Sequence, residues 1–338
     1  MYYSNRDVRI EEQPKPVIGP GEILLRVHAS GICGSDVMEW YRRDKVPLVL
    51  GHEVAGEVAE VGEGVTAWQV GDRIAASHHV PCHTCHYCRT GHPTACETLH
   101  RTKFYPGGFA EYVRLPAINV DRGVYRVPDG LSYVEASFAE PLACVLRGQN
   151  KIGIPPGASV LVIGVGVSGL MHVELARALG AGRIFATDLS PYRLEQAARF
   201  GATATFTAAE YDAAKLRALN DGRLADRVIV TSGAGAAIQQ GLDSAERGAT
   251  VLVFAPTDEG VKFPLDINRF FWRLDRTLTT TYAGAPADHI QALDLIAAGR
   301  FRARDMVTHV LPLARIQEGF ALVARGDASL KVVIEPQE

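Results

Sequence analysis

The sequence has no long hydrophobic run and no excess of either charge. Its longest apolar stretch, Val160 to Leu170, contains three glycines and is soon followed by Glu174, so it is too short to span a bilayer. The formal net charge is only −3 over 338 residues, which gives no electrostatic basis for binding nucleic acid or an anionic membrane. The first residues turn polar at once, unlike a signal peptide. We therefore expect a soluble, cytoplasmic protein that binds neither nucleic acid nor membranes.

Cysteine is also scarce, and its distribution argues against a disulfide framework. Four of the six cysteines lie in one segment, at Cys82, Cys85, Cys88 and Cys96. In a reducing compartment, cysteines clustered in this way are metal ligands more often than disulfide partners. The spacing C-x2-C-x2-C-x7-C lets four thiolates converge on one tetrahedral zinc ion. Because four protein ligands leave no position for a substrate, we expect a closed, structural zinc site.

Histidines are concentrated in the same part of the chain, where six of the eleven lie between positions 78 and 100. One of them could replace a thiolate as a ligand, but four cysteines already suffice for zinc. We therefore expect surface positions on a loop for all six of these residues, which are His78, His79, His83, His86, His92 and His100.

The pattern of hydrophobic residues changes near residue 150, and the length itself is typical of about two domains. Before residue 150, short apolar runs separated by Gly and Pro predict the strands of a small barrel-like domain. After it, near-continuous apolar strands alternate with amphipathic helices, which predicts a parallel sheet covered on both faces. The strands that we expect in this second part are 159–163, 183–188, 226–232, 249–255 and 277–283.

A short helix is predicted at the junction of the two parts. Ser132 and Glu135 have the spacing of a capping box, which places a helix start near Tyr133. Pro141 disfavours helical geometry at Glu140. We therefore expect an interruption at Glu140, with its carboxylate pointing into a cleft instead of solvent.

The segment "GVGVSG" follows a β-branched strand and precedes a predicted helix, which is the context of a dinucleotide-binding turn. Its first glycine allows the tight turn, its second lets a pyrophosphate approach the backbone, and its third permits close packing of helix against sheet. The helix N-terminus adds free N–H donors. We assign Gly164, Gly166, Val167 and Gly169 to this cofactor site.

Asp188 ends the second strand of this unit, where a carboxylate accepts hydrogen bonds from the adenosine ribose and repels a 2′-phosphate. This favours NAD over NADP. Arg193 follows shortly after, and it either covers the adenine or is a solvated helix residue.

A second, sparser set of metal-ligating residue types is spread through the first part of the chain. Cys33 lies in "GICGSD", His52 and Glu53 lie in "GHE", and Glu140 lies in "AEP". A thiolate, an imidazole and carboxylates could together bind zinc with one exchangeable position.

With these segments, the sequence resembles the zinc-dependent medium-chain dehydrogenase/reductase family. The resemblance covers nearly the whole chain, through "GICGSD", "GHEVAGEVAEVGEGV", "VGDRI", the four-cysteine segment, "GGFAEYV", "AEPLA" and "GVGVSG". The combination of "GHE" and "EPLA" is most similar to polyol (sorbitol-type) and threonine dehydrogenases. The resemblance implies a GroES-like, mainly β catalytic domain over residues 1–148, completed by 287–338. It also implies a Rossmann domain over 149–286, with NAD in the cleft between the domains.

The resemblance also implies roles for single residues. Cys33 and His52 match the two invariant ligands of a catalytic zinc ion, which would be the second zinc of the chain. Glu53 matches the carboxylate ligand of the polyol branch, and Glu140 matches a second carboxylate that binds the metal or contacts its water.

Two neighbouring residues match supporting roles. Asp36 matches the residue that holds the other ring nitrogen of His52, which fixes the tautomer. Ser35 matches the hydroxyl that takes the proton of the alcohol. Met38 replaces a histidine that continues the proton relay in many relatives, so the proton would leave through a water chain, Glu53 or Glu140.

The function implied is the transfer of a hydride to NAD from a secondary hydroxyl of a polyol, sugar alcohol or cyclitol. Threonine or an aliphatic secondary alcohol is the alternative substrate, and a non-catalytic dinucleotide-binding protein is the remote alternative. By resemblance we also expect a homo-oligomer, either a dimer or a tetramer. Six aromatic residues lie near stretches that border the substrate in relatives, although core positions are more frequent for such side chains: Trp40, Phe104, Tyr105, Phe109, Phe271 and Trp272.

Overall fold

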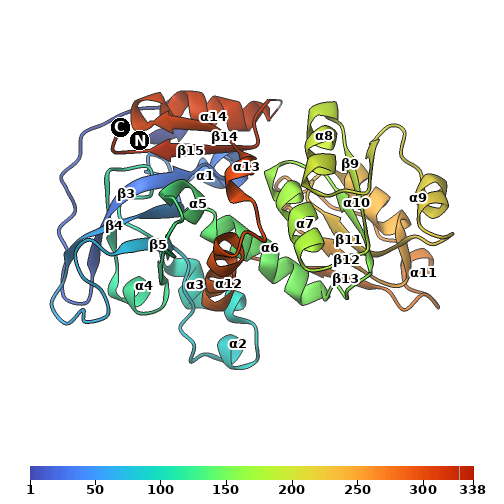
Figure 1. The fold of residues 1–338 in the computed structure, drawn as a ribbon, viewed down its shortest axis with the longest axis horizontal. Coiled ribbons are helices and arrows are strands. Elements are labelled where there is room, and N and C mark those ends of the chain that lie inside the picture. Colours follow the sequence, from blue (N-terminus) through green and yellow to red (C-terminus); the bar gives the residue numbers. More distant parts are fainter. Residues whose placement is uncertain (327) are drawn as a thin grey trace. The chain divides into compact units, whose positions relative to one another are not determined.

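The computed structural model describes residues 1–326 and 328–338 and contains two compact units. The first unit combines Met1–Cys144 with Ala283–Glu338, and the second is Val145–Tyr282. The chain leaves the first unit within helix α6 (Ala139–Ile152) and returns to it shortly after strand β13 (Thr277–Thr280). The domain boundaries expected from the resemblance lie a few residues beyond these positions. Figure 1 shows the elements of each unit.

The first unit is built around a seven-stranded sheet in the order β14-β15-β3-β4-β5-β7, with β6 paired to β3. Most of β3 is buried, and its residues Ile23 and Leu25 pack with Val58 of β4 in one core cluster. The strands of the unit are β1 (Tyr2–Ser4), β2 (Asp7–Val8), β3 (Ile23–Gly31), β4 (Glu53–Val61), β5 (Arg73–Ser77), β6 (Tyr112–Leu115), β7 (Val124–Arg126), β14 (Val307–Pro312) and β15 (Lys331–Glu335).

Most helices of the first unit are short. Besides α6, the helical segments are η1 (Gly34–Val37), α1 (Glu39–Arg42), α2 (His86–Arg89), η2 (Pro93–Ala95), α3 (Glu97–Arg101), α4 (Ala117–Arg122), α5 (Tyr133–Ala136), α12 (Pro286–Ala297), α13 (Ala303–Met306), η3 (Leu313–Arg315) and α14 (Ile316–Arg325).

The C-terminal strand β15 completes the sheet of the first unit beside β3. Gly31 of β3 pairs with Val333 of β15 on one side and with Glu53 of β4 on the other. Gly31 cannot carry a side chain here, because a Cβ would lie 2.0 Å from Glu53 Oε2 and 2.7 Å from Lys331 Cε. The missing side chain leaves space for these two charged groups.

The second unit is a six-stranded parallel sheet in the order β10-β9-β8-β11-β12-β13. This order is that of a doubly wound dinucleotide-binding fold, with its switch point between β8 and β11. The predicted Rossmann sheet is therefore confirmed, with β10 as an additional strand. The elements are β8 (Ser159–Ile163), α7 (Val167–Ala178), β9 (Arg183–Asp188), α8 (Pro191–Phe200), β10 (Ala204–Thr207), α9 (Ala213–Leu219), β11 (Ala225–Val230), α10 (Gly235–Asp243), β12 (Ala245–Val253), α11 (Ile267–Phe270) and β13.

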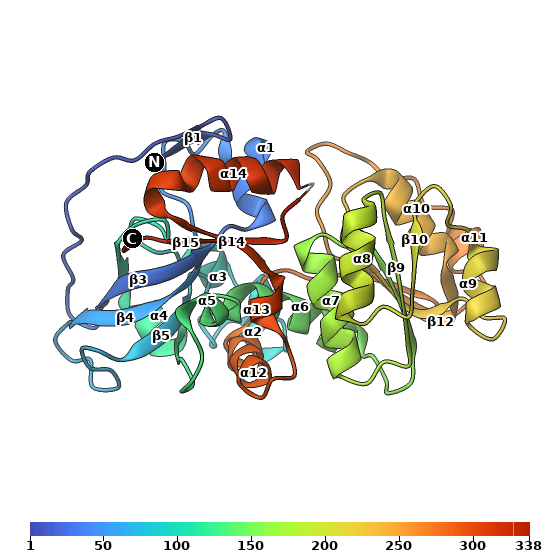
Figure 2. The same cartoon turned by 45° about the horizontal axis from the view of Figure 1, so that its top comes forward.

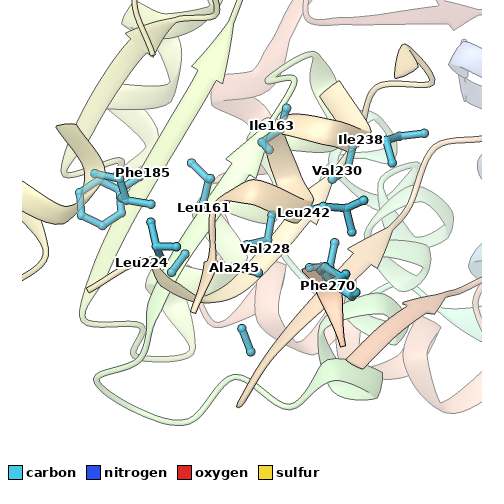
Figure 3. Packing of buried hydrophobic residues seen from close by; sticks show 14 residues of the cluster. Leu161, Ile163, Phe185, Leu224, Val228, Val230, Ile238, Leu242, Ala245 and Phe270 are labelled. Atoms are coloured by element: carbon cyan, nitrogen blue, oxygen red, sulfur yellow. The ribbon is translucent and has the colours of Figure 1, made fainter. Parts of the chain in front are cut away.

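Helices cover both faces of this sheet, with α7 and α8 on one face and α9 to α11 on the other (Figure 2). On the second face, Leu161 and Val228 of the sheet form a core with Leu242 of α10 and Phe270 of α11 (Figure 3). Each such side chain, when fully buried, contributes about 1.5–3 kcal/mol to stability. This buried sheet gives the turn after β8 a rigid support.

The junction helices correct one expectation. The capping box is confirmed, because Ser132 Oγ accepts from the Glu135 N–H and Glu135 Oε2 accepts from the Ser132 N–H. The predicted interruption at Glu140 is wrong, because α6 runs from Ala139 to Ile152 without a break there. Pro141 lies in the first helical turn, where its missing N–H would have no intrahelical partner.

Among the residues that the structure describes, no helix combines the length and hydropathy that a bilayer span requires.

Candidate active site and metal centres

The ends of two adjacent strands bring three ligand types together in the first unit. Cys33 follows β3 and caps η1, where its Sγ accepts the Ser35 N–H at 3.4 Å. His52 immediately precedes β4, and Glu53 is its first residue. One donor atom each of Cys33, His52 and Glu53 lie within 4.8 Å of one another. The structure thus assembles the thiolate, imidazole and first carboxylate of the expected catalytic set.

Asp36 fixes the histidine of this group. Its side chain is fully buried, its Oδ2 accepts the Cys33 N–H at 3.0 Å, and its Oδ1 lies 3.5 Å from His52 Nδ1. Burial alone would raise the pKa of Asp36, but the neighbouring His52 and Arg42 hold it below its usual value. Burial likewise disfavours the charged imidazole, yet Asp36 raises the pKa of His52 well above its ordinary value. Nε2 is the nitrogen that remains for a metal ion.

Glu53 has a cationic partner that the sequence analysis did not identify. Its Oε2 forms an ion pair with Lys331 Nζ, and both side chains are 1% exposed. Lys331 also donates to the Ile32 carbonyl at 3.2 Å. The other oxygen, Oε1, is buried and has no hydrogen-bond partner among the described residues. A buried acceptor without a partner is costly, and a bound cation would satisfy it.

Glu140 stands apart from this three-residue group. It is not among the described donors that lie within 4.8 Å of one another. Its Oε1 accepts the Cys144 thiol at 3.5 Å, one turn along α6. Burial is the main cause that raises the pKa of Glu140 to about 7, while His52 and Lys331 act in the opposite direction. Burial and the Glu140 charge also raise the pKa of Cys144 well above its usual value.

The donor set of Cys33, His52 and Glu53 fits zinc, which takes thiolate, imidazole and carboxylate ligands and keeps an open position in catalytic sites. Glu140 lies outside this donor set, although the charges of His52 and Glu53 affect its pKa.

The four clustered cysteines form the second candidate metal centre. Their Sγ atoms lie within 4.8 Å of one another and form no disulfide. Hydrogen bonds from the Thr84 hydroxyl and from the Thr84 and Cys85 N–H groups lower the pKa of Cys82 to about 5. The Cys82 N–H in turn donates to Cys96 Sγ at 3.4 Å. Such N–H···S bonds stabilise thiolates, so this group fits a closed zinc site.

The expectation for the loop histidines is confirmed at four positions and wrong at two. His83, His86, His92 and His100 are exposed. His78 and His79 are partly buried, because β5 leads them inward beside the catalytic group.

The ring of His78 lies beside that of His52. It lies 4.8 Å from the ring of His52 and 3.7 Å from that of His79, measured between centroids. Its Nδ1 is buried without a hydrogen-bond partner among the described residues. Burial, followed by the neighbouring His79 and His52, lowers the pKa of His78 well below its usual value. His78 therefore places a neutral imidazole beside His52.

In the second unit, the glycine-rich turn has the geometry that its sequence predicts. Gly164 has a φ of +83°, and a Cβ on Gly169 would lie 2.0 Å from the Gly164 carbonyl oxygen. Gly166 caps α7, whose first residue is Val167. The turn therefore needs glycine for conformation and for close approach, and it leaves free N–H groups at the start of α7.

Asp188 lies beside this turn and is held by the backbone. Its Oδ2 accepts the Val165 N–H at 2.7 Å and its Oδ1 accepts the Ser190 N–H at 2.9 Å. The Arg193 guanidinium lies 3.9 Å from Asp188 Oδ2 and next to Gly166. The structure thus brings Asp188 and Arg193 to the glycine-rich turn.

The six aromatic candidates fall into different environments. Phe104 and Phe109 are core residues, and Phe271 packs against the core of the second unit. Tyr105 and Trp272 are exposed, and Trp40 is partly buried.

Comparison with known proteins agrees with this geometry. Residues 19–129 match the family "Alcohol dehydrogenase GroES-like domain", and residues 167–298 match "Zinc-binding dehydrogenase". The chain is 32% identical to the sorbitol dehydrogenase of Bacillus subtilis over 353 residues, which cover 99% of this chain and 96% of that protein. It is 34% identical to the L-threonine 3-dehydrogenase of Bacillus licheniformis, with coverages of 96% and 94%.

Among solved structures, the alcohol dehydrogenase TADH from Thermus sp. ATN1 superposes with a TM-score of 0.84 at 32% identity. The match covers 99% of this chain and 98% of that one. The similarity thus extends over both units of the chain. The chain belongs to the zinc-dependent medium-chain dehydrogenase/reductase family and is an NAD(P)-dependent alcohol dehydrogenase acting on CH–OH groups.

Proposed function

We propose that this enzyme oxidises a secondary hydroxyl of a polyol, sugar alcohol or cyclitol with NAD as the hydride acceptor. The observation that carries the proposal is the convergence of Cys33, His52 and Glu53 within 4.8 Å, in a chain that also has a complete dinucleotide-binding turn. A non-catalytic dinucleotide-binding protein would have no use for such a set of ligands.

The residues of the proposed active site have different roles. Cys33, His52 and Glu53 hold the catalytic zinc ion, and Asp36 keeps the His52 ring in one orientation. When bound, zinc supplies Lewis-acid chemistry, which favours the ionised form of an alcohol near neutral pH. Glu140 serves as an additional ligand or holds a water molecule.

Ser35 handles the proton of the alcohol. Its hydroxyl accepts that proton on one lone pair and releases its own hydrogen to water, so that Ser35 stays neutral throughout. The thioether of Met38 cannot continue this relay. Replacing Ser35 by Ala should therefore lower turnover and alter its pH dependence.

NAD would bind at the glycine-rich turn of the second unit and accept the hydride. Gly164, Gly166, Val167 and Gly169 let the pyrophosphate approach the start of α7. Asp188 accepts the ribose hydroxyls and disfavours NADP, and Arg193 covers the adenine.

Two observations favour a polyol over threonine. The cations beside the catalytic group, Arg42 and Lys331, are already paired with Asp36 and Glu53, so neither offers a partner for a substrate carboxylate. The neutral imidazole of His78 suits a second hydroxyl group instead. A relative of similar identity is a threonine dehydrogenase, so threonine remains the alternative substrate.

We also propose a homo-oligomer. Among the described strands, β13 is the edge of the second unit's sheet and pairs with β12 alone. Leu278 on β13 and Trp272 just before it are exposed. An unpaired, partly apolar edge strand favours pairing with a second copy. Sedimentation of the wild type and of Leu278→Lys tests this, with dissociation expected for the variant.

The function is tested by following NAD reduction with sorbitol, a cyclitol, threonine and an aliphatic secondary alcohol. Zinc is measured in the same preparations. We expect two zinc ions per chain and the highest kcat/KM with a polyol or cyclitol. Cys33→Ser should lose one zinc together with activity, whereas the matched variant Cys85→Ser should lose the other. A single zinc and no NAD reduction with any alcohol would instead support a non-catalytic protein.

A further inference from the structure

Arg42 joins two residues of the proposed active site through one guanidinium group. Its Nη2 lies 3.5 Å from Ser35 Oγ and 3.5 Å from Asp36 Oδ1, and its Nε donates to the Ser35 carbonyl at 3.2 Å. The Arg42 side chain is 13% exposed, whereas that of Asp36 is fully buried. No motif in the sequence marks Arg42 as a residue of the site.

The local fold explains how Arg42 reaches this position. Ser35 and Asp36 lie in η1, which is closed by the capping box between Cys33 and Asp36. Helix α1 follows directly and ends at Arg42. The turn between the two helices folds the last residue of α1 back over η1. Met38, at that turn, offers no hydrogen-bonding group of comparable strength.

The effect of Arg42 on Ser35 follows from the charge and the hydrogen-bonding properties of a guanidinium group. It remains charged at all accessible pH values and only donates hydrogen bonds. A donor from Arg42 occupies one of the two lone pairs of Ser35 Oγ. The second lone pair then remains for the O–H of the alcohol, and the Ser35 hydrogen remains for an onward acceptor.

We propose that Arg42 is a positioning residue that orients the Ser35 hydroxyl for proton transfer. The inference rests on the function of Ser35 proposed above. Arg42 itself transfers no proton in this proposal, because its guanidinium stays protonated. Its pairing with the buried Asp36 carboxylate anchors the guanidinium, and this argues against a role in binding an anionic substrate.

The kinetic test compares Arg42→Gln with the wild type and with Arg43→Ala, a matched control at the neighbouring exposed arginine. We expect kcat for the preferred alcohol to fall about 10- to 100-fold, the size of a lost hydrogen bond to a charged group. KM and zinc content should change less than about twofold, because the ligands stay in place. Arg43→Ala should match the wild type, and Arg42→Lys should lie between the wild type and Arg42→Gln.

A double-mutant cycle shows whether Arg42 acts through Ser35. In a Ser35→Ala background, Arg42→Gln should cause no further loss of kcat. The proposal would be overturned if the losses of kcat in the two single variants multiplied in full in the double variant. It would also be overturned if Arg42→Gln left kcat unchanged or lost zinc. If Arg42→Gln does not fold, Arg42→Lys replaces it in the same double-mutant cycle.

A readout without turnover separates this inference from the proposed function. Crystal structures of the zinc-loaded wild type and of Arg42→Gln should show the Ser35 side chain in one rotamer in the wild type and in another, or in several, in the variant. An unchanged single rotamer would contradict the proposal. If the wild type oxidises no alcohol, the proposed function fails, while the rotamer comparison still decides whether Arg42 holds Ser35.

Discussion

The ammonium group of Lys331 forms an ion pair with the Glu53 carboxylate inside the first unit, although the two residues come from opposite ends of the chain. Strand β15 carries Lys331 to this place, and the absent side chain of Gly31 leaves room for the contact. The pair neutralises a candidate metal ligand that would otherwise be a buried, uncompensated charge. Pairing of β15 with β3 and formation of the candidate metal site are therefore coupled.

Replacing Lys331 by Met should destabilise the zinc-free protein by about 3–5 kcal/mol, because it leaves the buried Glu53 charge without a partner. The free energy of unfolding in urea measures this. The matched control Lys151→Met removes an exposed ammonium that donates to the Thr280 carbonyl, and it should change stability by less than about 0.5 kcal/mol. The double variant Lys331→Met with Glu53→Gln should recover most of the loss. Equal stability of Lys331→Met and wild type would show that the pair contributes nothing.

The sequence predicts the residues of the site better than their surroundings. Cys33, His52 and Glu53 were identified because each lies in a recognisable segment, and the glycine-rich turn because its spacing has a direct conformational cause. Nothing local marks Lys331 as a partner of Glu53, since strand pairing across the whole chain brings them together. A lysine that opens the apolar strand "KVVI" is the only hint of burial.

Other errors have local physical causes. The predicted interruption at Glu140 is wrong because a proline in the first helical turn, such as Pro141, removes no hydrogen bond. The expectation of surface positions is wrong for His78 and His79, although it holds for the other four histidines of this part of the chain. His78 and His79 directly follow β5, whose residues are mostly buried, and this keeps them partly buried as well. Composition alone does not distinguish these cases.

The four-cysteine centre should be structural and independent of turnover chemistry. Replacing Cys85 by Ser removes one of four ligands, and the segment from Cys82 to Cys96 should lose its order because it has few core contacts of its own. We expect faster cleavage of this segment in limited proteolysis and the loss of one zinc ion. Thr90→Ala, an exposed change in the same segment, serves as the control. Normal zinc content with unchanged cleavage would refute a role for Cys85 as a ligand.

Asp188 should determine the preference for NAD. Asp188→Asn keeps an acceptor for the Val165 N–H but removes the charge that repels a 2′-phosphate. The ratio of kcat/KM for NAD to that for NADP should fall by about tenfold or more, which corresponds to about 1.4 kcal/mol. Asp226→Asn is the matched control, because Asp226 accepts from Ser159 at the opposite end of β8. An unchanged ratio would remove Asp188 from the cofactor site.

His172 should make the second unit sensitive to acid. It is fully buried in α7, and burial lowers its pKa from 6.5 to about 3. Because the folded-state pKa is below the unfolded one, the neutral ring favours folding above pH 6.5, and this contribution is lost as pH falls from 6.5 towards 3. At pH 5 the loss is about 2 kcal/mol.

His172→Gln has no titrating group, so its stability should fall less between pH 8 and pH 5 than that of the wild type. Urea unfolding at the two pH values measures the difference. His92→Gln, at an exposed position, should behave like the wild type. If His172→Gln shows the same fall as the wild type, another group is responsible for the acid sensitivity.

His78 should distinguish substrates with several hydroxyl groups from those with one. Its Nδ1 is buried beside His52 without a partner among the described residues, and a hydroxyl next to the reacting carbinol would satisfy it. His78→Phe keeps a flat ring but removes the hydrogen bond, so kcat/KM for a polyol should fall about tenfold, as expected for about 1.5 kcal/mol. The value for an aliphatic secondary alcohol should stay the same or rise, because a site built for a hydroxyl penalises a substrate that lacks it. Equal losses for both substrates would mean that His78 only supports the packing of the His52 ring.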